Sequence, residues 1–182
     1  MEAIQIRIGT VKDVHSFYPF FKQSLHDLFP EYTPATRQYF TDIPYTKTSI
    51  VEMLRKRAVN LFLAFDHDRI IGYFLTHKTH AGVAMAIWIA VHSEFQKKGI
   101  ATKLVQIWEE TAVYEGAHAL QLWTRDHNVP FYKNRGFTLV GKFPNAWYGV
   151  DINMLYKLIQ KPEEKHFLKD YFGNIEAEEE NA

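Results

Sequence analysis

Runs of apolar residues, several alternating with polar ones, recur along the chain at the length and spacing of strands. The first, at residues 3–9, alternates apolar and polar positions and ends at Gly9, which predicts a half-buried strand. Turn-forming residues separate the later runs, and the second, third and fourth runs are close enough to form an antiparallel meander. The later strands are expected at residues 60–66, 70–79, 83–91, 118–124, 137–143 and 149–159.

Apolar residues at spacings of three and four predict helices between these strands. The first helix is expected at residues 14–29, after a capping pattern formed by Thr10 and Asp13. Pro19 should kink this helix or shift its start, because proline cannot donate a helical hydrogen bond. Further helices are expected at residues 50–57, 98–115 and 130–135.

The segment between the first two helices, residues 30–48, shows no helical or strand period. It contains three prolines and four aromatic residues, and we therefore expect a loop-rich connection. Ser49 and Glu52 have the spacing of a capping box and are expected to begin the second helix.

The predicted order is one strand, two helices, three strands, then a helix, a strand, a helix and two strands. This order is typical of an α/β (α+β layered) domain with a mixed sheet between helices. We assign residues 1–160 to a single domain and residues 161–182 to a C-terminal extension whose acidic end is expected to be mobile.

Composition narrows the class of protein. The 182 residues are 47% hydrophobic, with 21 basic and 21 acidic side chains, so no overall charge attracts nucleic acid or an anionic membrane. No cysteine is present, which excludes disulfides, thiolate catalysis and cysteine-ligated zinc. No run approaches the roughly 18 apolar residues of a membrane span. We expect a soluble, cytoplasmic protein that binds neither nucleic acid nor membrane.

The most informative stretch joins the strand at 83–91 to the helix at 98–115. The first N–H groups of a helix have no partner within it and carry partial positive charge, so a helix N-terminus suits an anion such as a phosphate. Gly99 and Ala101 would let a ligand approach the backbone, and Lys97 and Lys98 add positive charge. Neither the P-loop spacing nor the dinucleotide fingerprint G-x-G-x-x-G is present.

Two motifs together resemble the GNAT superfamily of acetyl-CoA-dependent N-acetyltransferases. The first is Gln96 to Ala101, "QKKGIA", after a strand; the second, about thirty residues later, is "FYKNRGF", in which Phe131, Tyr132, Gly136 and Phe137 match the family pattern. The motifs, their spacing and the element order agree over about residues 3–160. The resemblance implies a mostly antiparallel sheet that is splayed between its fourth and fifth strands, and acetyl-CoA as co-substrate without a metal.

The resemblance also implies roles for particular residues. The main-chain amides of the first motif would cradle the coenzyme A pyrophosphate, the backbone of the preceding strand would pair with the pantetheine arm, and Asn128 would reach that arm. The expected coenzyme-binding residues are Ile89, Ala90, Val91, Gln96, Lys97, Lys98, Gly99, Ile100, Ala101, Thr102 and Asn128. The small residues Ala84, Ala86 and Ala90 are compatible with the strand bulge that splays the sheet in this family. Arg125 stands where the family usually has asparagine.

The reaction that the resemblance implies requires proton transfer, because an amine attacks a thioester only when neutral and the leaving thiolate must be protonated. Tyr132 occupies the family's tyrosine and is the expected acid. The base stays open among loop residues near the expected cleft: Glu31, His92, Glu94, Asp126 and His127. His77 and His80 would face opposite sides of a strand, which argues against a metal site.

The acceptor amine would meet residues 28–48 and 142–155, which set acceptor specificity in this family. Their aromatic residues could wall a pocket for a small amine, a polyamine, a peptide N-terminus or a lysine side chain, and Asp151 could steer a cation. The aromatic residues concerned are Phe29, Tyr32, Tyr39, Phe40, Tyr45, Trp147 and Tyr148.

Two other functions stay open. The absence of an obvious base is compatible with a non-catalytic acyl-CoA sensor or interaction module, and the helix N-terminus alone is compatible with a simple nucleotide or phosphate binder. Apolar pairs at 167–168 and 171–172 could dock on the domain or on a second copy of the chain, so a homodimer is possible.

Overall fold

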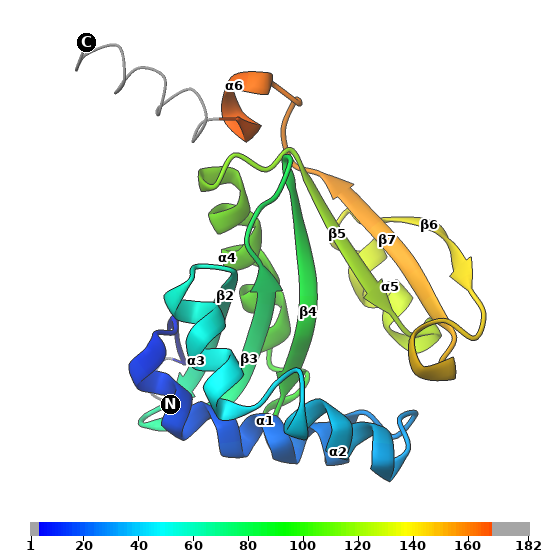
Figure 1. The fold of residues 1–182 in the computed structure, drawn as a ribbon. Coiled ribbons are helices and arrows are strands. Elements are labelled where there is room, and N and C mark those ends of the chain that lie inside the picture. The colour runs from blue at the N-terminus through cyan, green and yellow to red at the C-terminus, as the bar shows by residue number, and fades with distance from the viewer. Residues whose placement is uncertain (1–3, 169–182) are drawn as a thin grey trace.

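A single seven-stranded sheet organises the chain in the computed structural model, which describes residues 4–168 (Figure 1). The strand order across the sheet is β1-β2-β3-β4-β5-β7-β6, and only β4 and β5 are parallel neighbours. This arrangement confirms the predicted mixed, mostly antiparallel sheet and the meander of its second to fourth strands. The strands are β1 (Gln5–Ile8), β2 (Val59–Asp66), β3 (Arg69–His77), β4 (Val83–Val91), β5 (Ala119–Thr124), β6 (Thr138–Phe143) and β7 (Ile152–Leu158).

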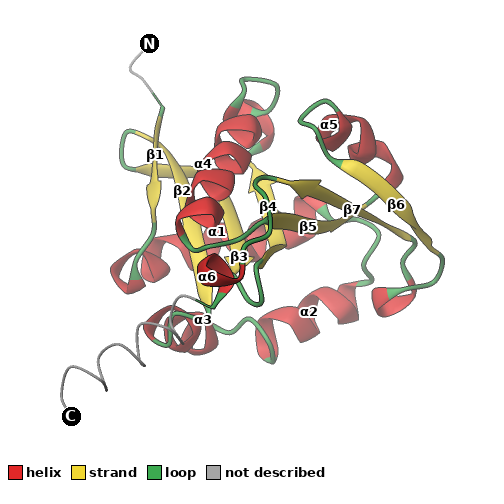
Figure 2. Ribbon diagram, turned by 90° about the horizontal axis from the view of Figure 1, so that it is seen from above, coloured by secondary structure: helices red, strands yellow, loops and turns green. Residues whose placement is uncertain are grey.

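Helices cover both faces of the sheet (Figure 2). The helices are α1 (Val14–Leu28), α2 (Pro34–Asp42), α3 (Lys47–Arg55), α4 (Ile100–Tyr114), α5 (Val129–Lys133) and α6 (Glu164–Phe167). One core lies beneath α1, α2 and α3, and a second lies beneath α4 and α5. Within the described residues, no helix combines the length and the apolar character that crossing a membrane requires.

Strand β2 shows why the sheet has two cores. Successive side chains of a strand point to opposite faces, and here Leu61 and Leu63 join the core under α1 while Phe62 and Ala64 join the core under α4. All four side chains are fully buried. A strand with both faces covered therefore becomes a continuous apolar run rather than an alternating one.

The sheet splays open between β4 and β5, as predicted. The two strands pair only from Val83 to Met85, opposite Ala119 to Gln121, and diverge beyond that point. The register of β4 against β3 moves from Trp88 to Ala86 within one step of β3, which leaves Ile87 as a bulged residue. Since a bulge bends its strand, the expected bulge lies where β4 turns away from β5, as Figure 1 shows.

The prediction of a loop over residues 30–48 was wrong, because α2 occupies its middle. Thr33 caps this helix by accepting a hydrogen bond from the Thr36 N–H at 3.1 Å, and Pro34 follows at the first helical position. A Thr-Pro pair is a helix start signal, which the high proline content of the segment obscured.

Two other helix starts differ in part from expectation. Helix α3 is capped by Thr46, which accepts from the Ser49 N–H at 2.9 Å, so Ser49 lies inside the helix rather than before it. Before α1, the Asp13 carboxylate accepts from the Thr10 N–H at 2.7 Å, as the capping pattern predicted. Helix α1 then continues through Pro19.

The extension after β7 begins with α6. Phe167 places its ring edge-on to His118, with ring centroids 5.8 Å apart, so this part of the extension contacts the body of the chain. The expected acidic end and the apolar pair at 171–172 lie outside the described residues.

Candidate active site

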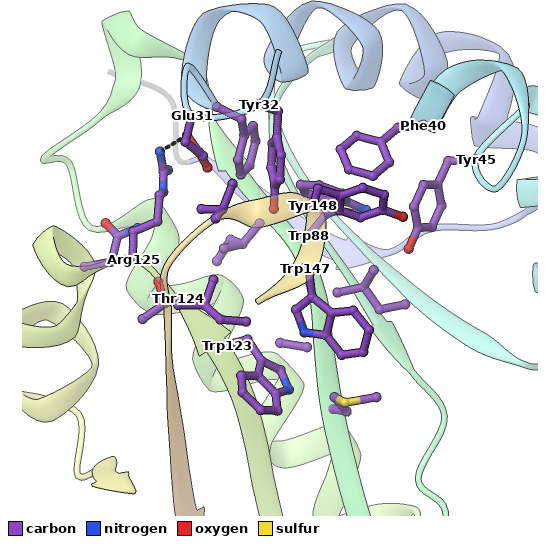
Figure 3. A pocket seen from close by; sticks show the side chains of 18 of the residues that line it. Glu31, Tyr32, Phe40, Tyr45, Trp88, Trp123, Thr124, Arg125, Trp147 and Tyr148 are labelled. Atoms are coloured by element: carbon purple, nitrogen blue, oxygen red, sulfur yellow. Dashed lines mark hydrogen bonds and ion pairs between the residues drawn. The ribbon is translucent and has the colours of Figure 1, made fainter. Parts of the chain in front are cut away.

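A cavity of about 430 Å³ opens between the diverging strands β4 and β5, on the side of the α1–α2 connection (Figure 3). The α1–α2 loop, the β6–β7 connection and α5 complete its walls. Because the sheet is unpaired here, main chain and side chains from distant parts of the sequence meet in one space. Its lining residues are Phe29, Glu31, Tyr32, Phe40, Pro44, Tyr45, His77, Met85, Ala86, Ile87, Trp88, Ile89, Trp123, Thr124, Arg125, Asn128, Tyr132, Trp147, Tyr148, Val150 and Ile152.

Trp88 forms the centre of an aromatic cluster on one wall. Its ring lies edge-on to Phe29 at 5.1 Å and near Phe40 at 5.2 Å between centroids, and Tyr32 and Tyr45 stand about it at 6.0 and 5.9 Å. Edge-to-face contacts at these distances are favourable for aromatic rings. The wall is therefore a packed surface whose shape the α1–α2 segment and β4 set together.

Tyr148 completes this wall from the β6–β7 connection. Its φ of +58° lies in the left-handed region, where a bulky side chain is uncommon and the backbone is strained. The strained backbone places the ring 4.8 Å from Phe40 and 6.1 Å from Tyr32, between centroids. Contacts with α2 and the α1–α2 loop thus hold Tyr148 in place, although its side chain is partly exposed.

An ion pair joins the two sides of the cavity. Arg125, at the end of β5, donates to the Glu31 carboxylate at 2.6 Å and to the Leu28 carbonyl at 3.2 Å, and its guanidinium lies 5.3 Å from the Phe29 ring centroid. Both charged side chains are largely buried, and Figure 3 shows the pair at the cavity edge. Arg125 therefore fastens the α1–α2 loop to β5, a role that its place in the motif did not indicate.

Tyr132 reaches the cavity from α5 and is held by the second motif. Gly136 has φ +83° and ends α5, which turns Phe137 into the core, stacked on Trp108 and edge-on to Tyr132 at 5.6 Å between ring centroids. Burial raises the pKa of the Tyr132 phenol to about 12, so it stays protonated at neutral pH. A phenol in this state can donate a proton.

The N-terminus of α4 has the main-chain geometry of an anion site. Gly99 adopts φ +80°, and an added Cβ there would meet no atom within 4 Å, so the space above it is open. The N–H of Lys103 makes the first bond of the helical ladder, to the Gly99 carbonyl at 3.1 Å, and the N–H groups before it stay available to a ligand. Lys97 and Lys98 are exposed beside these groups.

A side-chain contact links the two motifs. Arg135, from the second motif, donates to the Thr102 hydroxyl in the first turn of α4, and its guanidinium lies 3.6 Å from the Phe131 ring centroid. A positive charge at a helix N-terminus adds to the field that favours an anion there. The side chains of Ile100 and Ala101 point toward the core instead.

The open edge of β4 differs from expectation at one residue. The His92 N–H bonds to the Ile71 carbonyl at 2.8 Å, and because main-chain directions alternate along a strand, Ala90 also faces β3 with its N–H and C=O. Ile89 and Val91 face the cleft, where Gln96 donates to the Val91 carbonyl at 3.1 Å. The main-chain groups of Ala90 are therefore used in the sheet rather than offered to the cleft, and the Gln96 side chain holds the turn onto β4.

Most of the candidate bases lie away from the cavity. His92 and Glu94 follow β4 and lie near Arg69, while Asp126 binds Lys142 and Asn153 on the surface. The lining of the cavity includes neither these three residues nor His127. Glu31 alone among the candidates lines the cavity, and Arg125 already occupies its carboxylate.

The aromatic side of the cavity contains residues that the sequence did not single out. Six of the seven expected aromatic residues line the cavity; Tyr39 does not, and instead packs on Tyr148. The strands β4 and β5 add Trp88 and Trp123, and His77 at the end of β3 also lines the cavity. Side chains on one face of a strand alternate along the sequence. The aromatic residues of these two strands were therefore the sequence signal that could have identified this part of the lining.

Asp151, expected to steer a cation, does not line the cavity. It pairs with Lys142 at 3.2 Å and accepts from the Asn145 N–H at 3.0 Å, so it supports the β6–β7 connection. Across residues 4–168, no group of three or more histidine, aspartate or glutamate side chains is arranged to hold a metal ion.

Comparisons with known proteins agree with this geometry. The sequence pattern of the acetyltransferase (GNAT) family matches residues 21–137. N-alpha-acetyltransferase 30 of Schizosaccharomyces pombe is 30% identical over 121 residues, which cover 57% of this chain and 81% of that protein.

Solved structures show the same fold. The PaiA N-acetyltransferase of Thermoplasma acidophilum, in complex with coenzyme A, superposes with a TM-score of 0.71 at 16% identity and covers 86% of this chain and 99% of its own. The ribosomal-protein-S18-alanine N-acetyltransferase of Escherichia coli has a TM-score of 0.66 at 17% identity, over 89% of this chain and 97% of its own.

Proposed function

The chain belongs to the GNAT family of acetyltransferases, and from that premise we propose that it transfers an acetyl group from acetyl-CoA directly to a primary amine. The observation that carries the proposal is the conjunction of an open helix N-terminus at α4 with an unpaired edge of β4 that leads to Tyr132. The open amides suit the coenzyme pyrophosphate. The edge of β4 suits the amide-bearing pantetheine arm, which can pair as an added strand.

Under this proposal, the coenzyme and the acceptor enter the cavity from different sides of the sheet. The coenzyme would enter from α4 and α5, with its diphosphate at residues 97–102 and its arm along Ile89 and Val91. Asn128 lines the same cavity and would meet the arm from the β5 side. The thioester would then lie near Tyr132, and the acceptor would approach through the aromatic side of the cavity.

The reaction forms one bond and breaks one. The amine nitrogen attacks the thioester carbonyl carbon, the tetrahedral intermediate expels the coenzyme thiolate, and the nitrogen loses a proton. Tyr132 would donate its phenolic proton to the sulfur as the C–S bond breaks, so that the coenzyme leaves as a neutral thiol. The proton that the amine releases would restore the tyrosine or pass to water.

The cavity itself lowers the need for a dedicated base. Burial among apolar groups disfavours an ammonium ion and can lower its pKa by several units, each unit worth about 1.4 kcal/mol. Contacts of a cation with aromatic rings oppose this by only about 0.5–2 kcal/mol. Desolvation is therefore the larger effect, and an acceptor that enters the cavity loses its proton more readily than it does in water.

A direct test combines product analysis with a matched variant. The protein is incubated with acetyl-CoA and pooled amines, amino acids, polyamines and peptides, and thiol release and acetylated products are measured by mass spectrometry. We expect thiol release that depends on an acceptor and at least one N-acetylated product, with Tyr132→Phe retaining coenzyme binding but losing turnover. If calorimetry detected no binding of coenzyme A or acetyl-CoA, the proposal would be wrong.

A non-catalytic acyl-CoA sensor is the second candidate. It is favoured by one observation: the carboxylate that lines the cavity, Glu31, is already paired with Arg125. A sensor would bind acetyl-CoA without acceptor-dependent thiol release, and Tyr132→Phe would leave its behaviour unchanged. The same two measurements therefore separate the candidates.

A further inference from the structure

The surface of the cavity is largely apolar and aromatic. Nine of the 21 lining residues carry a phenylalanine, tyrosine or tryptophan side chain, including three of the four tryptophans of the chain. Such surfaces bury large apolar or aromatic groups and fix them by edge contacts. Figure 3 shows Tyr32, Phe40, Tyr45, Trp88 and Tyr148 gathered in one cluster, with Trp147 and Trp123 below it.

The same surface has little charge to offer. Among the lining residues that the structure describes, Glu31 is the only carboxylate and Arg125 the only guanidinium or ammonium, and they neutralise each other at 2.6 Å. His77 at the end of β3 also lines the cavity, and desolvation lowers its pKa, so its imidazole is mostly neutral near pH 7. A polycationic acceptor, each of whose charges needs a carboxylate or water, would leave charges unpaired here.

The position of the aromatic groups relative to the reacting end restricts which part of an acceptor they meet. Tyr132 and the open edge of β4 at Ile89 mark the end where the amine must arrive. Trp88, Tyr32 and Tyr148 belong to the same cavity, so they would surround the group that is attached next to the amine.

We propose that the acceptor is a primary amine that carries a bulky apolar or aromatic side chain next to the nitrogen, and that the aromatic cavity with its neutralised Glu31–Arg125 pair selects this class over polyamines. The inference rests on the proposed function, because it assumes that the cavity is the acceptor site. Two sources share the chemistry: a free arylalkylamine, or the α-amine of a peptide whose first residue is large and apolar.

The test measures acceptor binding without turnover. Calorimetry on protein saturated with coenzyme A, which has no acetyl group, compares phenylethylamine, ethylamine and spermidine. We expect phenylethylamine to bind at least about tenfold more tightly than ethylamine, the effect of burying one large apolar group, and more tightly than spermidine. Tighter binding of spermidine, or equal binding of the two monoamines, would overturn the inference.

A second comparison decides between the two sources. Tripeptide amides that begin with phenylalanine or alanine are titrated in the same way. If the phenylalanine peptide binds more tightly than both the alanine peptide and phenylethylamine, the cavity takes a peptide N-terminus. If phenylethylamine binds more tightly than either peptide, it takes the free amine; both results support the apolar class.

A charge-introducing variant with a matched control sharpens the test. Trp147 lines the cavity and is 59% exposed, whereas Phe143 lies in the same hairpin, is 53% exposed and does not line the cavity. Trp147→Glu should weaken phenylethylamine binding and strengthen spermidine binding, while Phe143→Glu, with the same charge change, should alter neither. If both variants shifted the preference equally, overall charge and not the cavity would set it, and the inference would be overturned.

The failure of this inference is distinguishable from failure of the proposed function. If the protein bound acetyl-CoA but transferred its acetyl group to no acceptor, the proposed function would be wrong. The order of affinities measured with coenzyme A would still decide whether the cavity selects apolar amines.

Discussion

The two sides of the opened sheet offer a ligand different chemical groups. On the proposed coenzyme side, the groups offered to a ligand are main-chain amides at the start of α4 and the edge of β4, next to each other in the sequence. On the proposed acceptor side they are aromatic side chains from segments that lie far apart in the sequence. A main-chain site can keep its function while side chains vary, whereas a side-chain site changes specificity with each substitution.

Tyr132 stands where the two sides meet, so its removal gives the largest expected effect. Tyr132→Phe keeps the ring that packs on Phe137 but removes the proton donor. We expect kcat to fall by about 10²–10⁴-fold, the usual contribution of a general acid, while the Kd of coenzyme A stays unchanged. Assays of thiol release measure kcat, and calorimetry measures the Kd of coenzyme A. A kcat within a factor of three of the original protein would remove Tyr132 from the chemistry.

Much of the coenzyme side was predictable from sequence because its signals are local. Glycine at a left-handed position, the following helix and the turn of the second motif lie within a few residues of one another. The mostly antiparallel sheet and its splay followed from the same resemblance. The direction of the Ala90 main chain toward β3 was not predictable, because a sequence motif does not state which main-chain groups face the neighbouring strand.

The acceptor side was predictable only in part because its contacts are long-range. Arg125 and Glu31 are 94 residues apart in the sequence, and neither residue signals the other. The aromatic residues within 28–48 and 142–155 could be predicted as a group. Trp88 and Trp123 were not predicted, because aromatic residues on strands usually pack in a core. Helix α2 was missed because prolines in a segment obscure a helix that begins at one of them.

Substitutions at two glycines with similar backbone conformations test whether the proposed coenzyme and acceptor sides are independent. Gly99 and Gly149 both have positive φ, +80° and +74°, and an added Cβ at either would meet nothing within 4 Å. A valine at each position carries a similar backbone penalty, about 1–2 kcal/mol of stability. We expect Gly99→Val to raise the Kd of coenzyme A at least about 30-fold, by loss of anion contacts at the helix N-terminus.

Gly149→Val is the control, because it lies beside Tyr148 in the β6–β7 connection. It should raise the KM for the acceptor and leave coenzyme affinity within twofold. Calorimetry with coenzyme A and steady-state kinetics with a good acceptor check this difference. Equal losses of coenzyme affinity in both variants would mean that the two sides are not independent.

The Glu31–Arg125 pair tests whether the acceptor side depends on a single long-range contact. Glu31→Gln leaves the largely buried guanidinium without a charged partner. Arg125→Gln likewise leaves the largely buried carboxylate without one. Because both side chains remain about a fifth exposed, the loss of stability should be about 1–2 kcal/mol per variant, less than for a fully buried pair.

A double variant completes the cycle. If the two residues act through each other, the double variant should lose less stability than the sum of the single variants. The KM for the acceptor should rise about tenfold in each single variant, since a looser α1–α2 loop displaces Phe29 and Tyr32, while coenzyme affinity should be unchanged. Denaturant unfolding and kinetics measure the effects; full additivity would show that the pair does not couple the α1–α2 loop to β5.

The smallest expected effect concerns pH and again involves Tyr132. Burial raises the pKa of its phenol from the ordinary 10.0 to about 12, so the folded state favours the neutral form. Its contribution to stability is complete below pH 10 and is lost as the pH rises toward 12. The difference in tyrosinate absorbance between the original protein and Tyr132→Phe should therefore be absent at pH 10. It should develop only above about pH 11, provided the fold persists. A difference with a midpoint at pH 10 or below would place the phenol in water, where it could not serve as the shielded acid that joins the two sides.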